Sequence, residues 1–352
     1  MTTVECSPTL RSVIVEPLRF TGSGSEYFRI WITNTFLSIV PLGIYSAWAK
    51  VRRTRYFYAN TRLAGASFEY HGKPAAILKG RIVALVLLVA YQLASESTRL
   101  LAAALFVLAL GGMPWLIWKS LQFRLYYSSY RGIRFGFAGS LAGAYIAYLL
   151  WPALALFTGF LLAPFAHQRI KRFQHTQSRY GAVHFDFHAG VGSFYLLFLK
   201  ALLVMLAGVI LLGLVFSGAL SMVTTRGVEP ATYRSLLAFM AALYAWFFLV
   251  IPVFSAMTQN LVWNHTSIGP HRFASRVSTA RVLFIALTNL VAIVCTLGLY
   301  TPFAKIRMMK YRIEAMALLA GGSLDDFVAD AQAQAGALGE GVADLLDLDL
   351  AL

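Results

Sequence analysis

Charged residues are scarce in this chain of 352 residues. They make up 13% of it, while hydrophobic residues make up 59%; an ordinary soluble domain has about 25% and about 45–50%. This composition excludes an ordinary soluble domain and predicts an integral membrane protein.

Cysteine is almost absent, and so are the short motifs of enzymes and cofactor sites. Cys6 and Cys295 are the only cysteines, which excludes a disulfide framework or a Cys-rich metal site. The chain has no GxxxxGK[ST] phosphate loop, no HExxH and no GxSxG. The seven acids before Glu314 are too scattered to nominate a general acid and base. We therefore expect neither an enzymatic activity nor a cofactor. The polar first 25 residues also lack the apolar core of a cleaved signal peptide.

Long apolar runs are what the chain does have. About 20 apolar residues cross the hydrocarbon of a bilayer as a helix, and the runs lack the alternation of barrel strands. The seven segments are 28–48, 79–94, 100–118, 141–166, 194–220, 236–256 and 282–304. The second and third, and the fifth and sixth, are typical of two helical hairpins. The predicted fold class is an all-α, multi-pass membrane protein of about seven helical segments.

Charge divides the chain into three parts: a polar segment 1–27, a membrane domain 28–312 and an acidic tail 313–352. All 30 Lys and Arg residues lie at or before Arg312, and eight of the 15 acids follow it. Because the cations adjoin apolar segments, we expect anionic lipid headgroups as partners, at about 1 kcal/mol per cation, and no nucleic acid. The tail is predicted either to dock on the basic connectors as an amphipathic helix or to stay solvated. Protein partners and oligomeric state are left open.

Two eleven-residue stretches, LGIYSAWAKVR ending at Arg52 and LGLYTPFAKIR ending at Arg307, repeat one pattern. Looser versions between them bring the number of units to five. Aromatic and basic residues in this order are typical of the membrane interface, so the motif is interpreted as ending an apolar helix and beginning a basic connector. Its residues are Gly43, Tyr45, Trp48, Lys50 and Arg52 in the first copy, and Gly298, Tyr300, Phe303, Lys305 and Arg307 in the last.

The connectors also contain short alternating stretches that predict β-strands, around Phe68–Tyr70, Phe135–Phe137 and Phe185–Phe187. These strands can pair into a small sheet only if they share one side of the membrane. Seven crossings divide the Lys and Arg residues 18 to 12, a weak orientation signal. If segments 28–48, 141–166 and 282–304 re-enter instead, about 27 Lys and Arg residues lie on one side of the membrane and three lie on the other. The lengths of the first and last segments favour seven crossings, and the re-entrant arrangement is the alternative.

Several stretches carry a resemblance to a known family: GSEYFRIWITNTFLSIVPLGIYSAWAKVRRTRYFYANTRLAGASFEYHG, NLVWNHTSIGPHRF and TNLVAIVCTLGLYTPFAKIRMMKYR. Over nearly the whole chain up to about Asp330 it resembles the YjgN family of bacterial inner-membrane proteins. The resemblance implies a multi-pass protein of the bacterial cytoplasmic membrane, without an assigned activity and without catalytic residues to carry over.

Three polar residues lie inside apolar segments: Asn34, Asn289 and Lys200. An ionisable group in a membrane segment suggests a functional site, although a Lys near a helix end can extend to the headgroups and an Asn can join neighbouring helices. Six of the seven histidines fall in two connectors, at spacings that match no zinc motif. The favoured function is a transporter or permease; the alternative is a membrane-anchored scaffold or a protein that binds anionic lipid.

Overall fold

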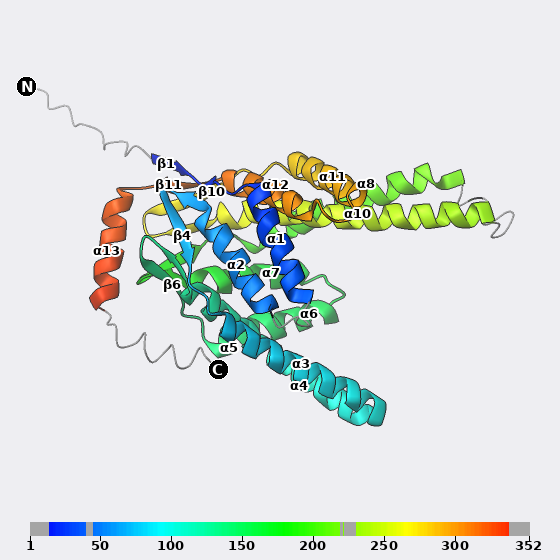
Figure 1. Cartoon of the computed structure of the whole chain (residues 1–352), viewed down its shortest axis with the longest axis horizontal. Coiled ribbons are helices and arrows are strands. Elements are labelled where there is room, and N and C mark those ends of the chain that lie inside the picture. Colours follow the sequence, from blue (N-terminus) through cyan, green and yellow to red (C-terminus); the bar gives the residue numbers. More distant parts are fainter. Residues whose placement is uncertain (1–13, 40–44, 219–220, 222–229, 338–352) are drawn as a thin grey trace, which may run out of the picture.

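The computed structural model describes residues 14–39, 45–218, 221 and 230–337. Along this part of the chain, two helices are followed by one or two short strands, and this order occurs five times. The strands gather at one end of the molecule, and two long helix pairs extend from it (Figure 1). The end of the molecule that holds the strands is therefore built from all five of these helix–strand stretches.

The helices form pairs of unequal length. The two long pairs are α3 (Pro74–Ser97) with α4 (Arg99–Tyr126), and α8 (Val191–Val215) with α10 (Pro230–Trp263). The short pairs are α1 (Gly24–Ile39) with α2 (Ser46–Ala59), α5 (Leu141–Tyr145) continuing through a π-helical turn into α6 (Trp151–Phe157) with α7 (Ala163–Thr176), and α11 (Thr279–Cys295) with α12 (Thr301–Glu314). A last helix, α13 (Leu324–Ala337), lies against the strands at the other end of the barrel (Figure 1).

The strands are antiparallel and form one sheet in the order β1-β11-β10-β9-β8-β7-β6-β5-β4-β3-β2. They are β1 (Ile14–Pro17), β2 (Arg19–Phe20), β3 (Thr61–Leu63), β4 (Ala66–Tyr70), β5 (Ser128–Tyr130), β6 (Ile133–Phe137), β7 (Ser178–Tyr180), β8 (Val183–Phe187), β9 (Thr266–Ile268), β10 (His271–Ser275) and β11 (Met316–Ala320).

One extended segment connects the two ends of this sheet. β1 pairs with β11, β2 pairs with β3, and only Leu18 separates β1 from β2. The amide of Leu18 donates to the carbonyl of Met316 at 3.0 Å, and that of Thr21 donates to the carbonyl of Asn60 at 2.9 Å. The sheet is therefore a nearly closed barrel. Its strands of two to five residues are far shorter than the roughly 9–11 residues that a membrane-spanning strand needs.

The prediction of an all-α protein with seven spanning segments is wrong. Among the described residues, four helices are long and apolar enough to cross a membrane: Pro74–Glu96, Arg99–Tyr126, Val191–Val215 and Tyr233–Trp263. Apolar segments 141–166 and 282–304 are each divided between two helices. Segment 28–48 also begins in one helix and ends in another, and its residues 40–44, with Gly43, lie outside the described residues.

The chain reverses in the middle of two of these segments because consecutive residues take a left-handed conformation. Gly159 and Phe160 have φ values of 58° and 67°, and Leu297 and Gly298 have values of 51° and 93°. At each reversal a threonine joins the two helices: the Thr158 hydroxyl accepts from the amide of Leu162, and the Thr296 hydroxyl accepts from that of Tyr300. Such turns keep backbone groups hydrogen-bonded, as a lipid environment requires.

A hydroxyl residue marks the step from helix to strand in four of the five stretches. Each hydroxyl donates to the carbonyl four residues earlier, at 2.7–2.8 Å. The residues are Thr61, Ser128, Ser178 and Thr266, each the first of its strand. Because the bond caps one of the free carbonyls at a helix C-terminus, it fixes where the helix ends and the barrel begins.

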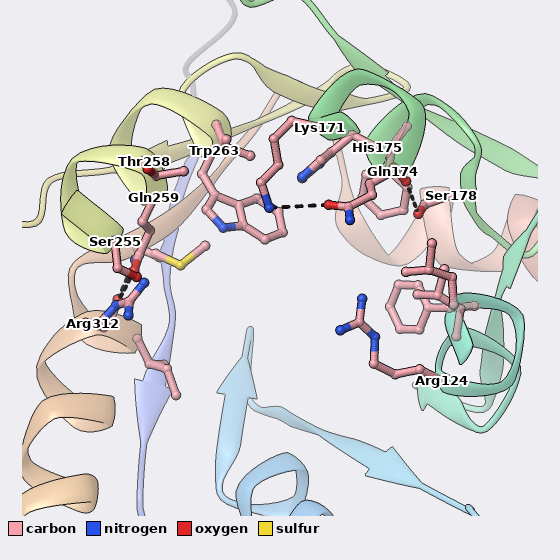
Figure 2. A pocket seen from close by; sticks show the side chains of 17 residues that line it. Arg124, Lys171, Gln174, His175, Ser178, Ser255, Thr258, Gln259, Trp263 and Arg312 are labelled. Atoms are coloured by element: carbon pink, nitrogen blue, oxygen red, sulfur yellow. Dashed lines mark hydrogen bonds between the residues drawn. The ribbon is translucent and has the colours of Figure 1, made fainter. Parts of the chain in front are cut away.

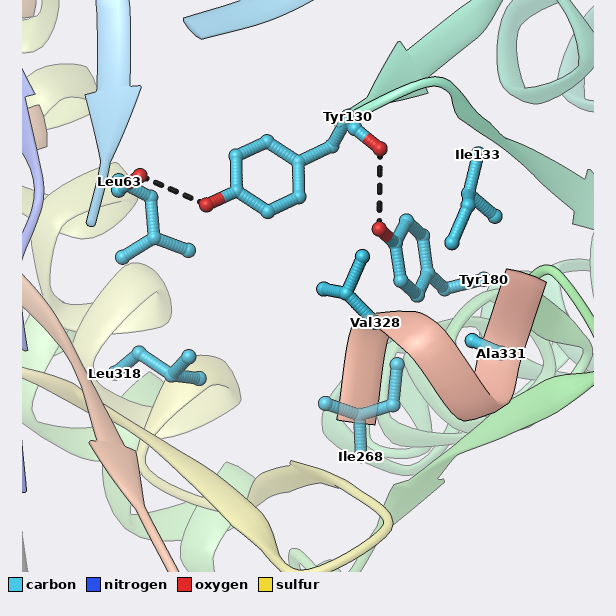
Figure 3. Packing of buried hydrophobic residues seen from close by; sticks show 8 residues of the cluster. All are labelled: Leu63, Tyr130, Ile133, Tyr180, Ile268, Leu318, Val328 and Ala331. Atoms are coloured by element: carbon cyan, nitrogen blue, oxygen red, sulfur yellow. Dashed lines mark hydrogen bonds between the residues drawn. The ribbon is translucent and has the colours of Figure 1, made fainter. Parts of the chain in front are cut away.

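The predicted Phe-x-aromatic strands are confirmed as β4, β6 and β8, and all three belong to one sheet. Strands of one sheet lie at the same end of the molecule, which is the condition set for their pairing. Alternate residues of these strands face the barrel axis. The tilted rings of Phe68 and Tyr130 lie 4.8 Å apart, and those of Phe135 and Tyr180 lie 5.2 Å apart, between ring centroids. Figure 3 shows that the hydroxyl of Tyr130 donates to the carbonyl of Leu63 and that of Tyr180 to the carbonyl of Tyr130, at 2.7 and 3.0 Å.

Candidate functional site

A cavity of about 490 Å³ lies where four helices reach the barrel. Figure 2 shows polar side chains from α4, α7, α10 and α12 pointing into it from opposite sides. The polar lining consists of Arg124, Lys171, Gln174, His175, Ser178, Ser255, Thr258, Gln259, Trp263 and Arg312. We call this space the cationic cavity.

Three cations from three different helices define the cationic cavity. Arg124 is in the last turn of α4, Lys171 is on α7, and Arg312 is in the last turn of α12. No acidic residue is among those that line it. The carbonyl ends of α4 and α12 offset part of this charge, since a helix C-terminus carries about half a negative charge. A net positive potential remains for a bound anion.

Two of the three cations, Lys171 and Arg312, are held in place by neutral partners. The Nζ of Lys171 donates to Oε1 of Gln174 at 3.3 Å. Oε1 of the buried Gln259 accepts from Nε of Arg312 at 2.7 Å, and its Nε2 donates to the carbonyl of Arg312 at 2.9 Å. The guanidinium of Arg124 has no protein hydrogen-bond partner in the described part of the chain, and neither does the buried hydroxyl of Thr258. Hydrogen-bonding capacity is therefore available for a ligand.

Burial and mutual repulsion disfavour charge in the cationic cavity. Burial, followed by the charge of Arg124, lowers the pKa of Lys171 below its usual 10.5. Burial, followed by the charge of Lys171, lowers the pKa of His175 to about 4. Burial also lowers the pKa of Arg312. An anion bound among these groups would relieve the repulsion and restore their charged forms.

The cationic cavity lies next to the interior of the barrel. A second cavity of about 420 Å³ occupies the barrel interior, and we call it the lumen. Six residues line both spaces: Leu125, Phe135, Phe185, Trp263, Ile313 and Met316. The remaining walls of the lumen are mainly aromatic and aliphatic side chains of the strands. A polar, cationic compartment thus adjoins an apolar one, and the six shared side chains form the wall between them.

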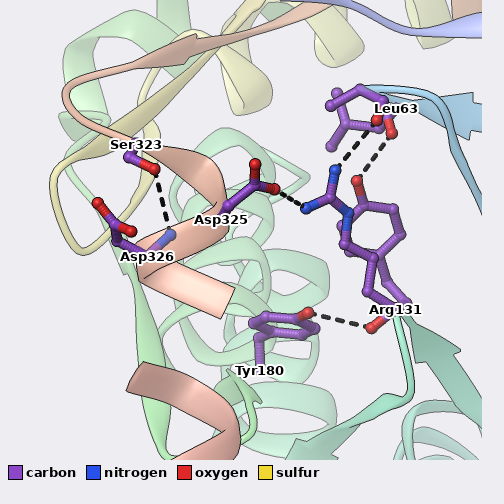
Figure 4. A network of polar contacts seen from close by, with 8 residues as sticks. Leu63, Arg131, Tyr180, Ser323, Asp325 and Asp326 are labelled. Atoms are coloured by element: carbon purple, nitrogen blue, oxygen red, sulfur yellow. Dashed lines mark hydrogen bonds and ion pairs between the residues drawn. The ribbon is translucent and has the colours of Figure 1, made fainter. Parts of the chain in front are cut away.

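Helix α13 closes the lumen at the end opposite the cationic cavity. Val328 and Ala331 are buried in the same cluster as Tyr130, Tyr180 and Leu318. Figure 4 shows how the helix is attached: the guanidinium of Arg131 pairs with Asp325 of α13 and donates to the carbonyl of Ala64 at 3.1 Å. In the described part of the acidic tail, Met316–Ala320 is a strand of the barrel and Leu324–Ala337 is a docked helix. Residues 338–352 lie outside the described residues.

The polar residues selected from the sequence do not line the cationic cavity. Asn289 is buried, and its side chain joins α11 to α12 by donating to the carbonyl of Ala304 at 3.2 Å and accepting from Arg307 at 3.4 Å. Asn34 is buried in α1, and its Oδ1 has no partner in the described part of the chain. Lys200 lies exposed on α8. The geometry gives Asn289 a packing contact.

Apart from Gly43, which lies outside the described residues, the residues of the repeated motif lie in or beside the helices of two short pairs, α1 with α2 and α11 with α12. Tyr45 stacks on Trp48 and Tyr300 on Phe303, at 6.3 and 5.6 Å between ring centroids. The Nζ of Lys305 lies 5.2 Å from the ring centre of Phe57. Lys50 and Arg52 are both exposed on α2. These contacts lie within and between the short helix pairs, and none of the described residues of the motif lines the cationic cavity.

Three histidines of the connectors, His167, His175 and His271, lie in three different surroundings. His175 lines the cationic cavity, His271 lines the lumen, and His167 packs among Phe194, Phe198 and Phe254. In the described ranges no three His, Cys, Asp or Glu side chains gather as metal ligands would.

Sequence reasoning missed the residues of the cationic cavity, although a positional signal exists. Arg124, Gln174 and Arg312 each lie four residues before the first strand of their stretch. Val262 and Phe57 hold the same place in the other two, and they line the cationic cavity and the lumen. The position faces the barrel axis in every stretch. An alignment of the five stretches on their strand starts would have identified it.

The four long apolar helices and the barrel at their ends define a membrane protein. The chain belongs to DUF898, a family of bacterial proteins of unknown function whose model matches residues 15–345. The inner membrane protein YjgN of Salmonella typhimurium strain LT2 is 32% identical over 140 residues, covering 40% of this chain and 35% of the relative. YjgN of Escherichia coli O157:H7 is 23% identical over 278 residues, covering 78% of this chain and 56% of the relative.

These matches confirm the resemblance to the YjgN family, and the relatives' names place them in the inner membrane. The chain spans about half the length, or less, of the relatives it matches. No solved structure matches it.

Proposed function

We propose that this protein is a multi-pass inner-membrane protein that binds the anionic headgroup of a lipid in the cationic cavity. The observation that carries the proposal is the convergence of Arg124, Lys171 and Arg312 on one space that no acid lines. Lys171 and Arg312 are partly buried and Arg124 is exposed, and no acid lines the cavity beside them. Holding partly buried cations without a counter-ion costs free energy, and an anionic ligand supplies the missing charge. Phosphate and carboxylate groups match the guanidinium donors that Arg124 leaves unused.

The proposed membrane arrangement follows from exposure. The four long helices expose apolar side chains along most of their length, with 0–17% of their most apolar windows buried. The reversals of the short pairs also expose large apolar residues: Leu297 is 96% exposed and Phe157 is 87% exposed. Such surfaces suit lipid contact. In this arrangement the two long pairs cross the bilayer, the short pairs enter it part-way, and the cationic cavity lies at the headgroup level.

Orientation follows from the cations. Arg99 and Arg234 lie near the free ends of the long pairs, whereas the connectors that build the barrel carry most of the Lys and Arg residues. The positive-inside rule then puts the barrel on the cytoplasmic side. The transport hypothesis gains no support from the cationic cavity, because Asn34, Asn289 and Lys200 do not line it.

The test measures ligand-induced thermal stabilisation of the purified full chain in an uncharged detergent. The probes are an anionic phospholipid, phosphatidic acid, a zwitterionic one, phosphatidylcholine, and inorganic phosphate. Arg124→Gln and Lys171→Gln remove one charge each, and Arg172→Gln is the matched control, since Arg172 is exposed on α7 beside Lys171 and outside the cavity lining.

Phosphatidic acid is expected to stabilise the wild type and the control. Each cavity variant is expected to bind it about tenfold or more weakly, since a hydrogen bond to a charged group contributes about 1.5–3 kcal/mol. Equal stabilisation of cavity variants and control would refute the site. If inorganic phosphate binds as tightly as phosphatidic acid, the ligand is a soluble anion and the lipid assignment is wrong.

A further inference from the structure

We propose that the lumen of the barrel is an acyl-chain site, so that the ligand is an anionic amphiphile with its headgroup in the cationic cavity and an acyl chain in the lumen. The inference rests on the proposed function, because the cationic cavity holds the headgroup. It adds what the rest of the ligand is and where it lies.

The first argument is that the cationic cavity and the lumen adjoin each other. Leu125, Trp263 and Met316 are among the six residues that line both spaces. A ligand held by Arg124, Lys171 and Arg312 therefore has its uncharged part directed either toward the surrounding lipid or into the lumen. Of these two directions, the lumen is a space of defined volume, about 420 Å³, within the usual 300–1,000 Å³ of small-molecule sites.

The second argument is that the lumen offers little to a polar ligand. Its tyrosine hydroxyls are used internally, since those of Tyr130 and Tyr180 donate to backbone carbonyls. Thr61 and Ser128 likewise donate to the carbonyls of Phe57 and Arg124. The remaining lining is aromatic and aliphatic except for His271. Hydrocarbon is the occupant that leaves no hydrogen bond of its own unmade in such a space.

The third argument concerns the closed end. Phe327 and Val328 of α13 line the lumen together with His271, whose ring lies 4.6 Å from that of Phe327. Both ring nitrogens of His271 are buried without a partner among the described residues, and burial lowers the pKa of this side chain. A neutral, sequestered imidazole beside the α13 rings ends the lumen. The chain is thus admitted from the cationic cavity and stopped at α13, which limits its length.

The test uses alkyl phosphates of increasing length, from inorganic phosphate through butyl and octyl to dodecyl phosphate, on the full chain in nanodiscs. Met316→Trp narrows the junction of the two spaces, and Val328→Trp fills the closed end. Leu319→Trp is the matched control, because Leu319 follows Leu318 on β11 and faces the opposite side of the sheet from the lumen. Binding is followed by the fluorescence of the native tryptophans and by thermal stabilisation.

For the wild type and Leu319→Trp, affinity is expected to rise about fourfold per CH₂ group, since each buried CH₂ contributes about 0.8 kcal/mol, up to a limiting length. Met316→Trp is expected to bind phosphate as before and to lose the dependence on chain length. Val328→Trp is expected to shorten the limiting length, while its affinity for butyl phosphate stays the same. If Val328→Trp does not fold, Met316→Trp alone still decides.

Affinity that is independent of chain length in the wild type, or equal length dependence in Met316→Trp and Leu319→Trp, overturns the inference and leaves the headgroup site standing. If the wild type binds neither phosphate nor any alkyl phosphate, the proposed function itself is refuted. The two failures are therefore distinguishable.

Discussion

Replacing Lys171 by methionine is expected to stabilise the protein while it removes the ligand. Lys171 lies in the cationic cavity with Arg124 and Arg312, and its hydrogen-bond partner, Gln174, is neutral. A buried ion replaced by an apolar side chain of similar volume commonly makes a protein more stable by about 1–4 kcal/mol. Methionine keeps the length of the lysine stem and removes the charge, so we expect a gain in this range at pH 7.

The pH dependence of this effect has a definite sign. Because the folded-state pKa of Lys171 lies below 10.5, the unfolded chain binds more protons than the folded protein between these two values. Stability contributed by this group is therefore reduced below the folded pKa and rises with pH up to 10.5, by at most about 1.4 kcal/mol per pH unit. The methionine variant lacks this rise. Its advantage over the wild type is thus largest near neutral pH and disappears as the pH approaches 10.5.

The assay is equilibrium unfolding in an uncharged detergent, with and without phosphatidic acid, compared between wild type and variant at each pH so that other titrating groups cancel. Lys310→Met is the control, since Lys310 is exposed and lies 4.0 Å from Glu314. A Lys171→Met variant that is no more stable than wild type at pH 7, and that keeps the same pH profile, would show that the cavity cations are not strained and would remove the reason for a ligand there.

Three further predictions concern the packing of the long helices, the barrel and the histidines. A Cβ on Gly208 of α8 would lie 1.9 Å from Cε2 of Trp246, whereas one on Gly213 meets nothing within 4 Å, so thermal unfolding should show a loss of about 1–3 kcal/mol for Gly208→Ala and little change for Gly213→Ala. Tyr130→Phe leaves the buried carbonyl of Leu63 without its donor and should cost about 1–3 kcal/mol in denaturant unfolding; Tyr195→Phe, which loses an exposed bond to Leu161, should cost less. Burial lowers the pKa of His167 from 6.5 to about 4, so between pH 6.5 and pH 4 the unfolded chain binds more protons than the folded protein. The free energy of unfolding therefore decreases as the pH is lowered through this range. His167→Leu should abolish about 3 kcal/mol of that loss, and a variant as acid-sensitive as wild type contradicts the assignment.

Sequence patterns identified the class of protein and part of its sheet. Apolar runs predicted membrane helices, and the long pairs appear as α3 with α4 and α8 with α10. Alternation in Phe68–Tyr70, Phe135–Phe137 and Phe185–Phe187 predicted strands that exist. The intervening strands β5, β7 and β9 were not predicted, because three residues are too few for a period of two to stand out.

The number of crossings was wrong for a physical reason. An apolar run indicates only that its residues avoid water. Both a single helix and two helices joined by a reversal are compatible with it. Each reversal here contains a single glycine in a left-handed pair, Gly159–Phe160 or Leu297–Gly298. Hydrogen bonds of Thr158 and Thr296 support the two turns. These residues occur commonly inside membrane helices, so they gave no stop signal.

The candidate site could not be found from single residues. Arg124, Lys171 and Arg312 are typical of the basic ends of membrane segments, and the sequence assigned such residues to orientation. Only the barrel brings them together, since they come from three helices of which two are separated by almost 200 residues of chain. Lys200, which looked more isolated in sequence, lies outside the cationic cavity on the exposed face of α8.

The shared strand β1–β2 has a consequence for the order of assembly. β1 finds its partner β11 only after Ala320 has been synthesised, while β2 pairs with β3, about 40 residues downstream. Both long helix pairs are complete before that point, so they can form while the barrel is still open at one seam. The first strand made and the last one made then close the barrel together, and a ribosome stalled before Met316 would leave the barrel open.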